Sequence, residues 1–269
     1  MEIKKIGLAA GAGELPLEFI RAVKSRGIQV PVFAVNGVTS PDIEKEADKV
    51  YWLNFGEFAK VMFFMLKEQL RHIALLGAIS RGLIYGSHGK YDEESGEILA
   101  RSVNKRDYSI LREVTEKLKK VGVQVVDPSE YLGHLIPVPG VLGNVNPSGT
   151  MDKDIAYGFR IAKEIAGHDI GQTVIVRDGV VIGVEAAEGT NAVIERAGKI
   201  AGAGCVMIKA GRPQQDMRWD VPTIGMETIT RLIDNKFKCL AIESGKMFFL
   251  QKQAAVQLAD ANSLSIVVL

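Results

Sequence analysis

Charged side chains that can handle a phosphate group lie close together between two prolines, Pro213 and Pro222. Each proline fixes its own φ and lacks an amide hydrogen, which predicts a segment that is not helical. In an extended chain, Asp216, Arg218 and Asp220 would share one face. Carboxylates bind hard cations such as Mg²⁺, and an arginine fork matches phosphoryl oxygens. The pattern indicates magnesium-assisted phosphate chemistry, with a structural Asp–Arg–Asp ladder of ion pairs as the alternative.

A second acidic cluster precedes a predicted helix. Thr190 or Asn191 can cap this helix, and the free amides of its first turn favour an anion. Glu185 and Glu188 can hold a metal ion or orient a water molecule. The alternative is a helix cap flanked by solvated glutamates. The polar run Asp169-Ile-Gly-Gln172 is expected to line the same cleft.

A glycine turn follows the first predicted strand. Gly11 and Gly13 let backbone amides approach a phosphate closely at the start of a helix. A dinucleotide fingerprint would have a third glycine in place of Pro16, and an acid in place of Asn36 at the end of the second strand. Both differences argue against a nicotinamide cofactor. The alternative to ligand binding is a tight turn whose glycines serve only the backbone geometry.

The predicted helix over residues 57–70 is apolar nearly all round. One interpretation is a helix buried against a sheet. The other is an adaptable surface that accepts an alkyl chain, a partner subunit or the membrane interface. If the ligand is an acylated lipid, we expect Phe55, Met62 and Met65 to pack around its chains.

Helices and strands alternate in the first half of the chain. This alternation is typical of a parallel sheet covered by helices on both faces. Residues 83–106 are expected to form a long loop or a partly helical excursion, and residues 131–152 a linker. Strands are predicted at residues 6–10, 30–35, 50–53, 72–76 and 123–126, and helices at 16–26, 57–70 and 108–121.

The second half of the chain has a mixed character. Asp178-Gly179 between two apolar runs predicts a β-hairpin. We expect an α/β protein with an N-terminal domain over residues 1–130 and a C-terminal mixed α/β domain over 131–269 that carries the acidic motifs. Strands are predicted at 173–176, 180–186, 205–209, 239–242 and 247–250, and helices near 155–166, 192–200 and 226–236.

The chain has 269 residues, a formal net charge of +1 and 47% hydrophobic residues. This composition is typical of a globular protein, and the lack of a basic stripe argues against a nucleic-acid partner. Cys205 and Cys239 are distant from each other and from the four histidines, which argues against a zinc site. With no signal peptide and no long apolar run, we expect a soluble, cytoplasmic protein.

Five motifs follow one another along the chain, namely Ala10-Gly-Ala-Gly-Glu-Leu-Pro16, Asp107-Tyr-Ser-Ile-Leu-Arg112, Asp169-Ile-Gly-Gln172, Val184-Glu-Ala-Ala-Glu-Gly-Thr190 and Gln215-Asp-Met-Arg-Trp-Asp-Val-Pro-Thr-Ile-Gly225. In this order they resemble the motifs of the UDP-2,3-diacylglucosamine pyrophosphatase family of lipid A biosynthesis, the LpxI type. The resemblance covers residues 5–250, and the last two motifs are the most specific. The family usually has aspartate where this chain has Tyr108 and Asn191.

The resemblance implies an N-terminal Rossmann-like domain, a distinct C-terminal domain and a ligand cleft between them. It also implies magnesium-dependent hydrolysis of UDP-2,3-diacylglucosamine to UMP and 2,3-diacylglucosamine 1-phosphate (lipid X), with water attacking the sugar-side phosphorus. A transferase that uses the same donor and a non-catalytic lipid or nucleotide-sugar binding protein are the alternatives. Peripheral contact with the inner membrane surface and formation of a homodimer are further expectations.

The expected site combines these motifs. Asp216, Asp220 and Arg218 are the expected catalytic residues. The two aspartates, together with Glu185 and Glu188, are the expected magnesium ligands. The expected substrate-binding residues are Gly11, Gly13, Leu15, Gln172, Gly189, Thr190, Lys209, Gln215 and Thr223.

Overall fold

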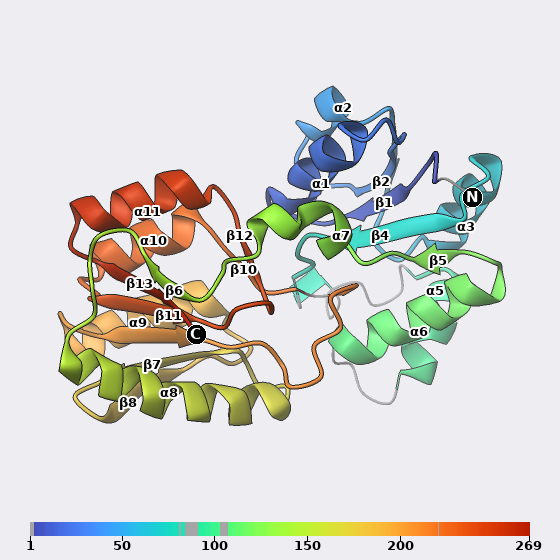
Figure 1. Ribbon diagram of the computed structural model, residues 1–269. Helices are drawn as coiled ribbons and strands as arrows, with labels where there is room; N and C mark the ends of the chain where they lie inside the picture. Colours follow the sequence, from blue (N-terminus) through green and yellow to red (C-terminus); the bar gives the residue numbers. More distant parts are fainter. Residues whose placement is uncertain (1–2, 81, 84–90, 103–106, 220) are drawn as a thin grey trace. The chain divides into compact units, whose positions relative to one another are not determined.

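The structure is a computed structural model that describes residues 3–80, 82–83, 91–102, 107–219 and 221–269 (Figure 1). The chain divides into two compact units, each an α/β structure, which confirms the predicted fold class. Unit 1 comprises Met1–Gly133 and Asp216–Asp220, and unit 2 comprises His134–Gln215 and Val221–Leu269. Among the described residues, no helix has the length and apolar character needed to cross a membrane.

Unit 1 is built on a five-stranded, fully parallel sheet in the order β3-β2-β1-β4-β5. This order is the one found at the start of doubly wound nucleotide-binding sheets, where the chain reverses its winding between β1 and β4. All five predicted strands are confirmed, with ends that shift by no more than one residue. The strands are β1 (Gly7–Ala10), β2 (Pro31–Val35), β3 (Lys49–Leu53), β4 (His72–Leu76) and β5 (Gln124–Val125).

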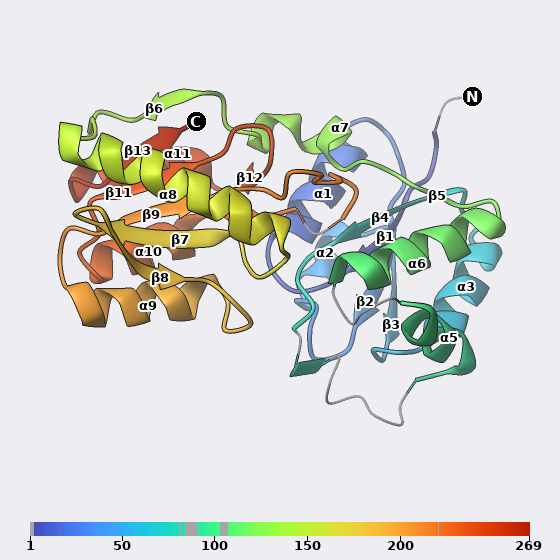
Figure 2. The ribbon, with the colours of Figure 1, turned by 90° about the horizontal axis from the view of Figure 1, so that it is seen from below.

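Helices cover both faces of this sheet (Figure 1, Figure 2). On one face, the rings of Phe19 and Tyr131 pack edge to face, with centroids 5.6 Å apart. The polar stretch over residues 83–106 contains a helix, in line with the partly helical alternative. One face carries α1 (Leu15–Lys24), α2 (Ile43–Glu46) and α7 (Ser129–Leu132), and the other carries α3 (Phe58–Lys67), α5 (Glu93–Arg101) and α6 (Asp107–Lys120).

Unit 2 is built on a six-stranded mixed sheet in the order β6-β13-β11-β9-β7-β8. The inner strands β9, β11 and β13 are parallel, and β7 and β8 form the predicted antiparallel hairpin. The predicted linker supplies a 3₁₀ turn, Gly133–Leu135, and the edge strand β6. The strands are β6 (Gly140–Leu142), β7 (Thr173–Arg177), β8 (Val180–Val184), β9 (Val206–Lys209), β11 (Cys239–Ile242) and β13 (Ser265–Val268), with β10 (Thr223–Ile224) and β12 (Phe248–Phe249) paired separately.

Two helical layers enclose the sheet of unit 2 (Figure 2). The long helix α8 approaches β9 closely at Gly158, where an added Cβ would lie 2.5 Å from Cδ1 of Ile208. The sequence pattern predicts no element beyond residue 250, yet α11 and β13 lie there, and β13 is an inner strand of the sheet. One layer is α8 (Gly149–Gly167), and the other comprises α9 (Thr190–Ala201), α10 (Met226–Asp234) and α11 (Lys252–Ala261).

The segment between Pro213 and Pro222 is not extended, so the predicted alternation of faces is wrong. Oδ1 of Asp216 accepts a hydrogen bond from the amide of Arg218 (3.0 Å), and the amide of Trp219 donates to the carbonyl of Asp216 (3.2 Å). An aspartate that binds the backbone two residues ahead closes a turn and competes with a strand. This turn directs the Trp219 ring into a hydrophobic cluster of unit 1, where it is 4% exposed.

Replacing Trp219 with alanine is expected to destabilise unit 1 by about 3–5 kcal/mol, because truncating a buried aromatic side chain loses transfer free energy and leaves a cavity. Urea unfolding followed by circular dichroism measures this change. The matched control is Trp52→Ala, since Trp52 is only partly buried and donates to Glu44 at an exposed position (2.6 Å). Equal losses for both variants would show that Trp219 does not anchor its segment to unit 1.

Candidate functional site

The glycine turn after β1 combines a packing requirement with an open position. An added Cβ at Gly11 would lie 2.7 Å from the carbonyl carbon and oxygen of Gly77, so Gly11 permits a close backbone approach. Gly13 has a φ of +96°, and a Cβ there would meet no atom of the described chain within 4 Å. The side chain of Leu15 is buried. The turn therefore supports the backbone-geometry alternative for Gly11 and leaves space for a ligand beside Gly13.

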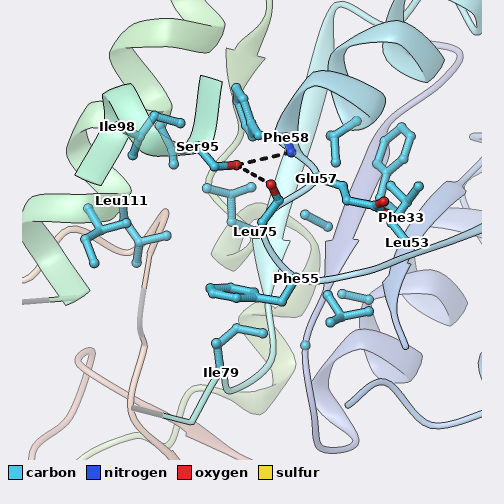
Figure 3. Close-up of a pocket in the computed structure, with 18 of the residues that line it drawn as sticks. Phe33, Leu53, Phe55, Glu57, Phe58, Leu75, Ile79, Ser95, Ile98 and Leu111 are labelled. Carbon is cyan, nitrogen blue, oxygen red and sulfur yellow. Dashed lines mark hydrogen bonds between the residues drawn. The ribbon is translucent and has the colours of Figure 1, made fainter. Parts of the chain in front are cut away.

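A cavity of about 320 Å³ lies within unit 1 and is lined by strands β1–β4 together with α3, α5 and α6 (Figure 3). Three residues at the start of the predicted apolar helix line it, namely Phe55, Phe58 and Val61. Met62 and Met65 instead pack in the hydrophobic cluster beside it. The helix therefore packs in the core and also borders a hollow. Of the residues expected around an acyl chain, Phe55 lines this hollow, whereas Met62 and Met65 do not, and acceptance of an alkyl chain stays a prediction.

Polar groups at the wall of this cavity bind one another. Oγ of Ser95 donates to the carbonyl of Gly56 (2.8 Å) and accepts from the amide of Phe58 (3.3 Å), as Figure 3 shows. The carboxylate of Glu57 accepts from Nζ of Lys60 (2.5 Å), which lowers the pKa of Glu57. These groups are already hydrogen-bonded, so the cavity offers mainly methyl, methylene and ring surfaces. Such a surface suits an alkyl chain better than a polar ligand.

The described part of the Asp-Arg-Asp motif forms an ion pair within the turn. Oδ1 of Asp216 accepts from Nε of Arg218 (2.9 Å), and Oδ2 accepts from its terminal nitrogen (2.6 Å). These hydrogen bonds lower the pKa of Asp216, so its carboxylate stays ionised. The guanidinium of Arg218 also lies over the ring of Trp219, 5.2 Å from its centroid. The other expected catalytic residue, Asp220, lies outside the described residues.

In unit 2, a lysine and a glutamate meet at the ends of three elements. Lys209 ends β9 opposite Thr173 of β7 and is 6% exposed. Its Nζ donates to Oγ1 of Thr190 (2.8 Å), at the start of α9, and lies 3.4 Å from Oγ1 of Thr173. The hydroxyl of Thr190 in turn donates to Glu185 (2.6 Å). The structure therefore brings Lys209, Thr190 and Glu185 together, as the sequence predicts.

The charge state of Glu185 depends on these neighbours. Burial raises the pKa of Glu185, but the charge of Lys209 and hydrogen bonds from Thr173, Thr190 and the amide of Gln172 outweigh it, so the pKa is lowered overall. The Glu185 carboxylate is therefore ionised at neutral pH. The buried Oε1 of Gln172 has no hydrogen-bond partner among the described residues. An unmatched acceptor beside the linked Lys209, Thr190 and Glu185 suits a ligand with a hydroxyl or amide donor.

The remaining expected residues of unit 2 have other partners. Glu188 pairs with Arg196 (2.5 Å), and Gly189 has a φ of +84° just before α9. Oε1 of Gln215 accepts from the amide of Arg212 (3.3 Å). Oγ1 of Thr223 donates to the carbonyl of Val221 (3.2 Å). The described chain contains no group of three or more His, Cys, Asp or Glu side chains that could hold a metal ion.

Two ion pairs that the sequence did not indicate fix the chain just before Asp216. Nζ of Lys163 donates to both carboxylate oxygens of Glu243 (2.9 and 3.0 Å), and Glu243 accepts from the amide of Gly211 (2.8 Å). Arg212 binds Asp169 through Nε (2.9 Å) and a terminal nitrogen (2.8 Å). The position of Glu243 directly after β11 is the one sequence signal that could have pointed to it, because polar residues at carboxyl ends of parallel strands often serve a site.

Replacing Lys209 with methionine is expected to destabilise the protein by about 2–3 kcal/mol near pH 7, because a partly buried carboxylate loses its cation. The lowered pKa of Glu185 adds stability above its ordinary value of 4.5, and this contribution is lost as the pH falls through the lowered value. The destabilisation should therefore shrink in acid. Urea titrations at several pH values measure it.

Two further variants complete this experiment. Glu185→Gln added to Lys209→Met should recover part of the lost stability, since no unpaired charge remains. Lys238→Met, which changes an exposed lysine beside β11, should have little effect at any pH. A destabilisation by Lys209→Met that is constant from neutral to acid pH would contradict the assigned charge interaction between Lys209 and Glu185.

Comparison with solved structures gives only weak likenesses. The biotin carboxylase domain of Hydrogenobacter thermophilus 2-oxoglutarate carboxylase aligns at a TM-score of 0.24 and 18% identity, over 75% of this chain and 42% of that one. A structure of glycinamide-RNase-transformylase T from Mycobacterium tuberculosis aligns at 0.26 and 13% identity, over 68% of this chain and 44% of that one. This chain therefore spans less than half of either structure.

Comparison with protein families covers nearly the whole chain. Residues 5–135 match the LpxI N-terminal domain, and residues 138–267 match the LpxI C-terminal domain. A curated relative, the UDP-2,3-diacylglucosamine pyrophosphatase LpxI of Caulobacter vibrioides, is 30% identical in an alignment 272 positions long that covers 96% of this chain and 95% of the relative. The protein therefore belongs to the LpxI family.

Proposed function

We propose that this protein hydrolyses UDP-2,3-diacylglucosamine, with water cleaving the pyrophosphate to give UMP and 2,3-diacylglucosamine 1-phosphate. The Caulobacter vibrioides relative is named for this substrate. The structural observation that carries the proposal is the apolar cavity of unit 1. A diacylated nucleotide sugar must bury alkyl surface, and each buried methylene contributes roughly 0.8 kcal/mol. Phe55, Phe58 and Val61 would contact an acyl chain there.

The buried cluster of unit 2 would bind the polar part of the substrate. Lys209 supplies a positive charge for a phosphate or a sugar oxygen, and Glu185 and Thr190 hold its ammonium group in place. Gln172 supplies an unmatched acceptor for a sugar hydroxyl or amide. Gly13 and Gly189 have positive φ and precede helices. Backbone amides at these helix starts would face a negatively charged phosphate group of the substrate. These roles are consistent with the expected substrate-binding set.

Magnesium dependence is part of the proposal. Asp216 and Asp220 would hold the ion, since magnesium in such enzymes is commonly bound by one or two carboxylates together with substrate phosphates. The lowered pKa of Asp216 keeps it in the ionised form that a hard cation requires. When bound, magnesium would neutralise charge on the phosphate oxygens. Glu185 and Glu188 bind Thr190 and Arg196, and their expected part as magnesium ligands stays a prediction.

The residues of the Asp216 turn have separate tasks. Asp216 orients Arg218 through two side-chain hydrogen bonds, and Arg218 would then clamp phosphoryl oxygens of the substrate. Burial of Trp219 fixes the turn that presents both groups. A lipid substrate also implies that the protein works at the cytoplasmic side of the inner membrane. Homodimer formation and a ligand cleft between the domains stay predictions.

Asp216→Ala and Asp220→Ala are each expected to lower kcat by about a hundredfold or more, as is usual when a residue acts mainly in the transition state. Release of UMP from UDP-2,3-diacylglucosamine provides the assay. Chelation should abolish turnover in the unmodified protein, and added Mg²⁺ should restore it. Glu188→Ala is the matched acidic control, with a change of only a few-fold. A loss at Glu188 as large as at Asp216 would place the metal in the second acidic cluster instead.

Val61→Phe is expected to fill part of the cavity and to raise KM for the diacylated substrate by about tenfold or more, because displaced methylenes each lose roughly 0.8 kcal/mol. KM for UDP-glucosamine, which has no acyl chains, should not change. Ala59→Phe is the control on the same helix, since Ala59 is exposed and does not line the cavity. If unmodified protein shows equal KM for the acylated and unacylated compounds, the cavity does not hold an acyl chain.

A further inference from the structure

Helix α3 exposes large apolar side chains on the side away from the core. Phe63 is 61% exposed and Leu66 is 68% exposed, three residues apart on the same helix. Ala59, Lys60 and Lys67 are the other exposed residues of α3. We call these five residues the outer face of α3. Phe63 and Leu66 are neighbours on this face, because residues three apart on a helix lie side by side.

The rest of α3 meets the needs of packing without these two side chains. Met65 is 2% exposed and lies in the hydrophobic cluster of unit 1, where Phe64 stacks on Tyr51 with ring centroids 4.2 Å apart. Phe58 and Val61 line the cavity. The helix therefore has a core side, a side that borders the cavity and the outer face. Neither packing in the core nor lining of the cavity requires Phe63 and Leu66.

The charged side chains on the outer face, and the one just beyond its end, are cationic. Lys60 and Lys67 lie on it, and Arg71 is exposed one turn beyond the helix. Of the acids nearby, Asp92 accepts from the amide of Ala59 (2.7 Å) at the first turn of α3, and two others are paired with cations. Glu57 binds Lys60 (2.5 Å). Glu68 accepts from three residues, Lys5 (3.0 Å), Lys49 (2.9 Å) and Tyr51 (2.6 Å), which together lower its pKa to about 2.

The electrostatics of the helix itself account for only part of this pattern. Lys67 lies in the last turn of α3, where a cation interacts favourably with the helix dipole. Lys60 is a helical turn or more from that end and pairs with Glu57. Neither effect explains why Phe63 and Leu66 face solvent between the two lysines. Apolar side chains bordered by cations on one helix face are typical of a surface that binds at the interface of an anionic bilayer.

We propose that the outer face of α3 docks on an anionic lipid bilayer. Phe63 and Leu66 enter the boundary between headgroups and acyl chains, while Lys60, Lys67 and Arg71 lie near lipid phosphates. This inference stands apart from the proposed hydrolysis, because it concerns the membrane surface and not a bound substrate. It also places the helix that borders the apolar cavity at the membrane.

Sedimentation with vesicles tests the docking surface. The full chain is mixed with vesicles of phosphatidylethanolamine and phosphatidylglycerol, and separately with vesicles of phosphatidylcholine alone. We expect binding to the anionic vesicles and weak binding to the neutral ones. Phe63→Gln with Leu66→Gln should weaken binding to anionic vesicles about tenfold or more. Lys60→Gln with Lys67→Gln should reduce the preference for anionic lipid and its sensitivity to salt.

The matched control changes two apolar side chains of similar exposure in unit 2. Val180 is 59% exposed and Ile200 is 64% exposed, and neither belongs to α3. Val180→Gln with Ile200→Gln should bind vesicles like the unmodified protein. Circular dichroism of each variant checks that the protein is folded. If the unmodified protein binds neither vesicle, or if the Phe63/Leu66 variant binds like the control, the proposal is overturned.

Two further measurements distinguish docking on lipid from pairing of two copies and from catalysis. If the Phe63/Leu66 variant changes from a dimer to a monomer in size-exclusion chromatography while vesicle binding is unchanged, a second copy covers this face and the lipid proposal is overturned. Hydrolysis is assayed with substrate dispersed in detergent, where docking is not needed, and the variant should keep its activity there. A protein that docks normally but releases no UMP would contradict the proposed function and leave the docking surface supported.

Discussion

Burial of Trp219 is the constraint on which the arrangement of the acidic motif depends. Chain segments on either side of residues 216–220 belong to unit 2, whereas this short stretch belongs to unit 1. A short turn has little stability of its own, because one ion pair at a partly exposed position contributes at most about 1 kcal/mol. The indole supplies the larger stabilisation by burying its ring in the cluster that includes Phe33, Met65 and Leu118. Asp216 and Arg218 are thus positioned mainly by the residue that follows them.

In unit 2, electrostatic interactions hold the polar residues of the expected site in place, whereas in unit 1 burial of an apolar side chain does so. A lysine at 6% exposure has lost much of its hydration. The negative charge of Glu185, linked to Lys209 through Thr190, offsets part of this cost. Gly171 lets the chain pass close to Glu185, since a Cβ there would lie 2.1 Å from the Glu185 carbonyl oxygen. The Asp-Ile-Gly-Gln motif therefore requires glycine at its third position, because any side chain there would clash with the backbone of Glu185. The side-chain oxygen Oε1 of the adjacent Gln172 accepts no hydrogen bond from any described residue.

The sequence predicts regular elements well where apolar runs are long, and it fails where local hydrogen bonding or distant pairing decides the structure. The five strands of unit 1 follow from short, mainly apolar runs that alternate with helical patterns. Two prolines exclude a helix around Asp216, but a side-chain hydrogen bond to the amide of Arg218 selects a turn over the extended chain. β13 is four residues long and becomes an inner strand only through pairing with β11, a partner that no local pattern reveals. The cavity is likewise beyond local prediction, because its wall combines strands and helices that are distant in the sequence.

The size of the cavity gives an independent reason to connect it with a ligand. The cavity has a volume of about 320 Å³ and a mainly apolar lining, and apolar surface that is left unpacked costs free energy. Side chains could reduce this cost by filling the space, since Val61, Val114 and Ala34 are all smaller than a leucine would be at the same positions. The wall nevertheless keeps small residues and hydrogen-bonds its own polar groups through Ser95. A fold that maintains such an apolar hollow beside a well-packed core is suited to receive an alkyl chain, which would restore the missing contacts on binding.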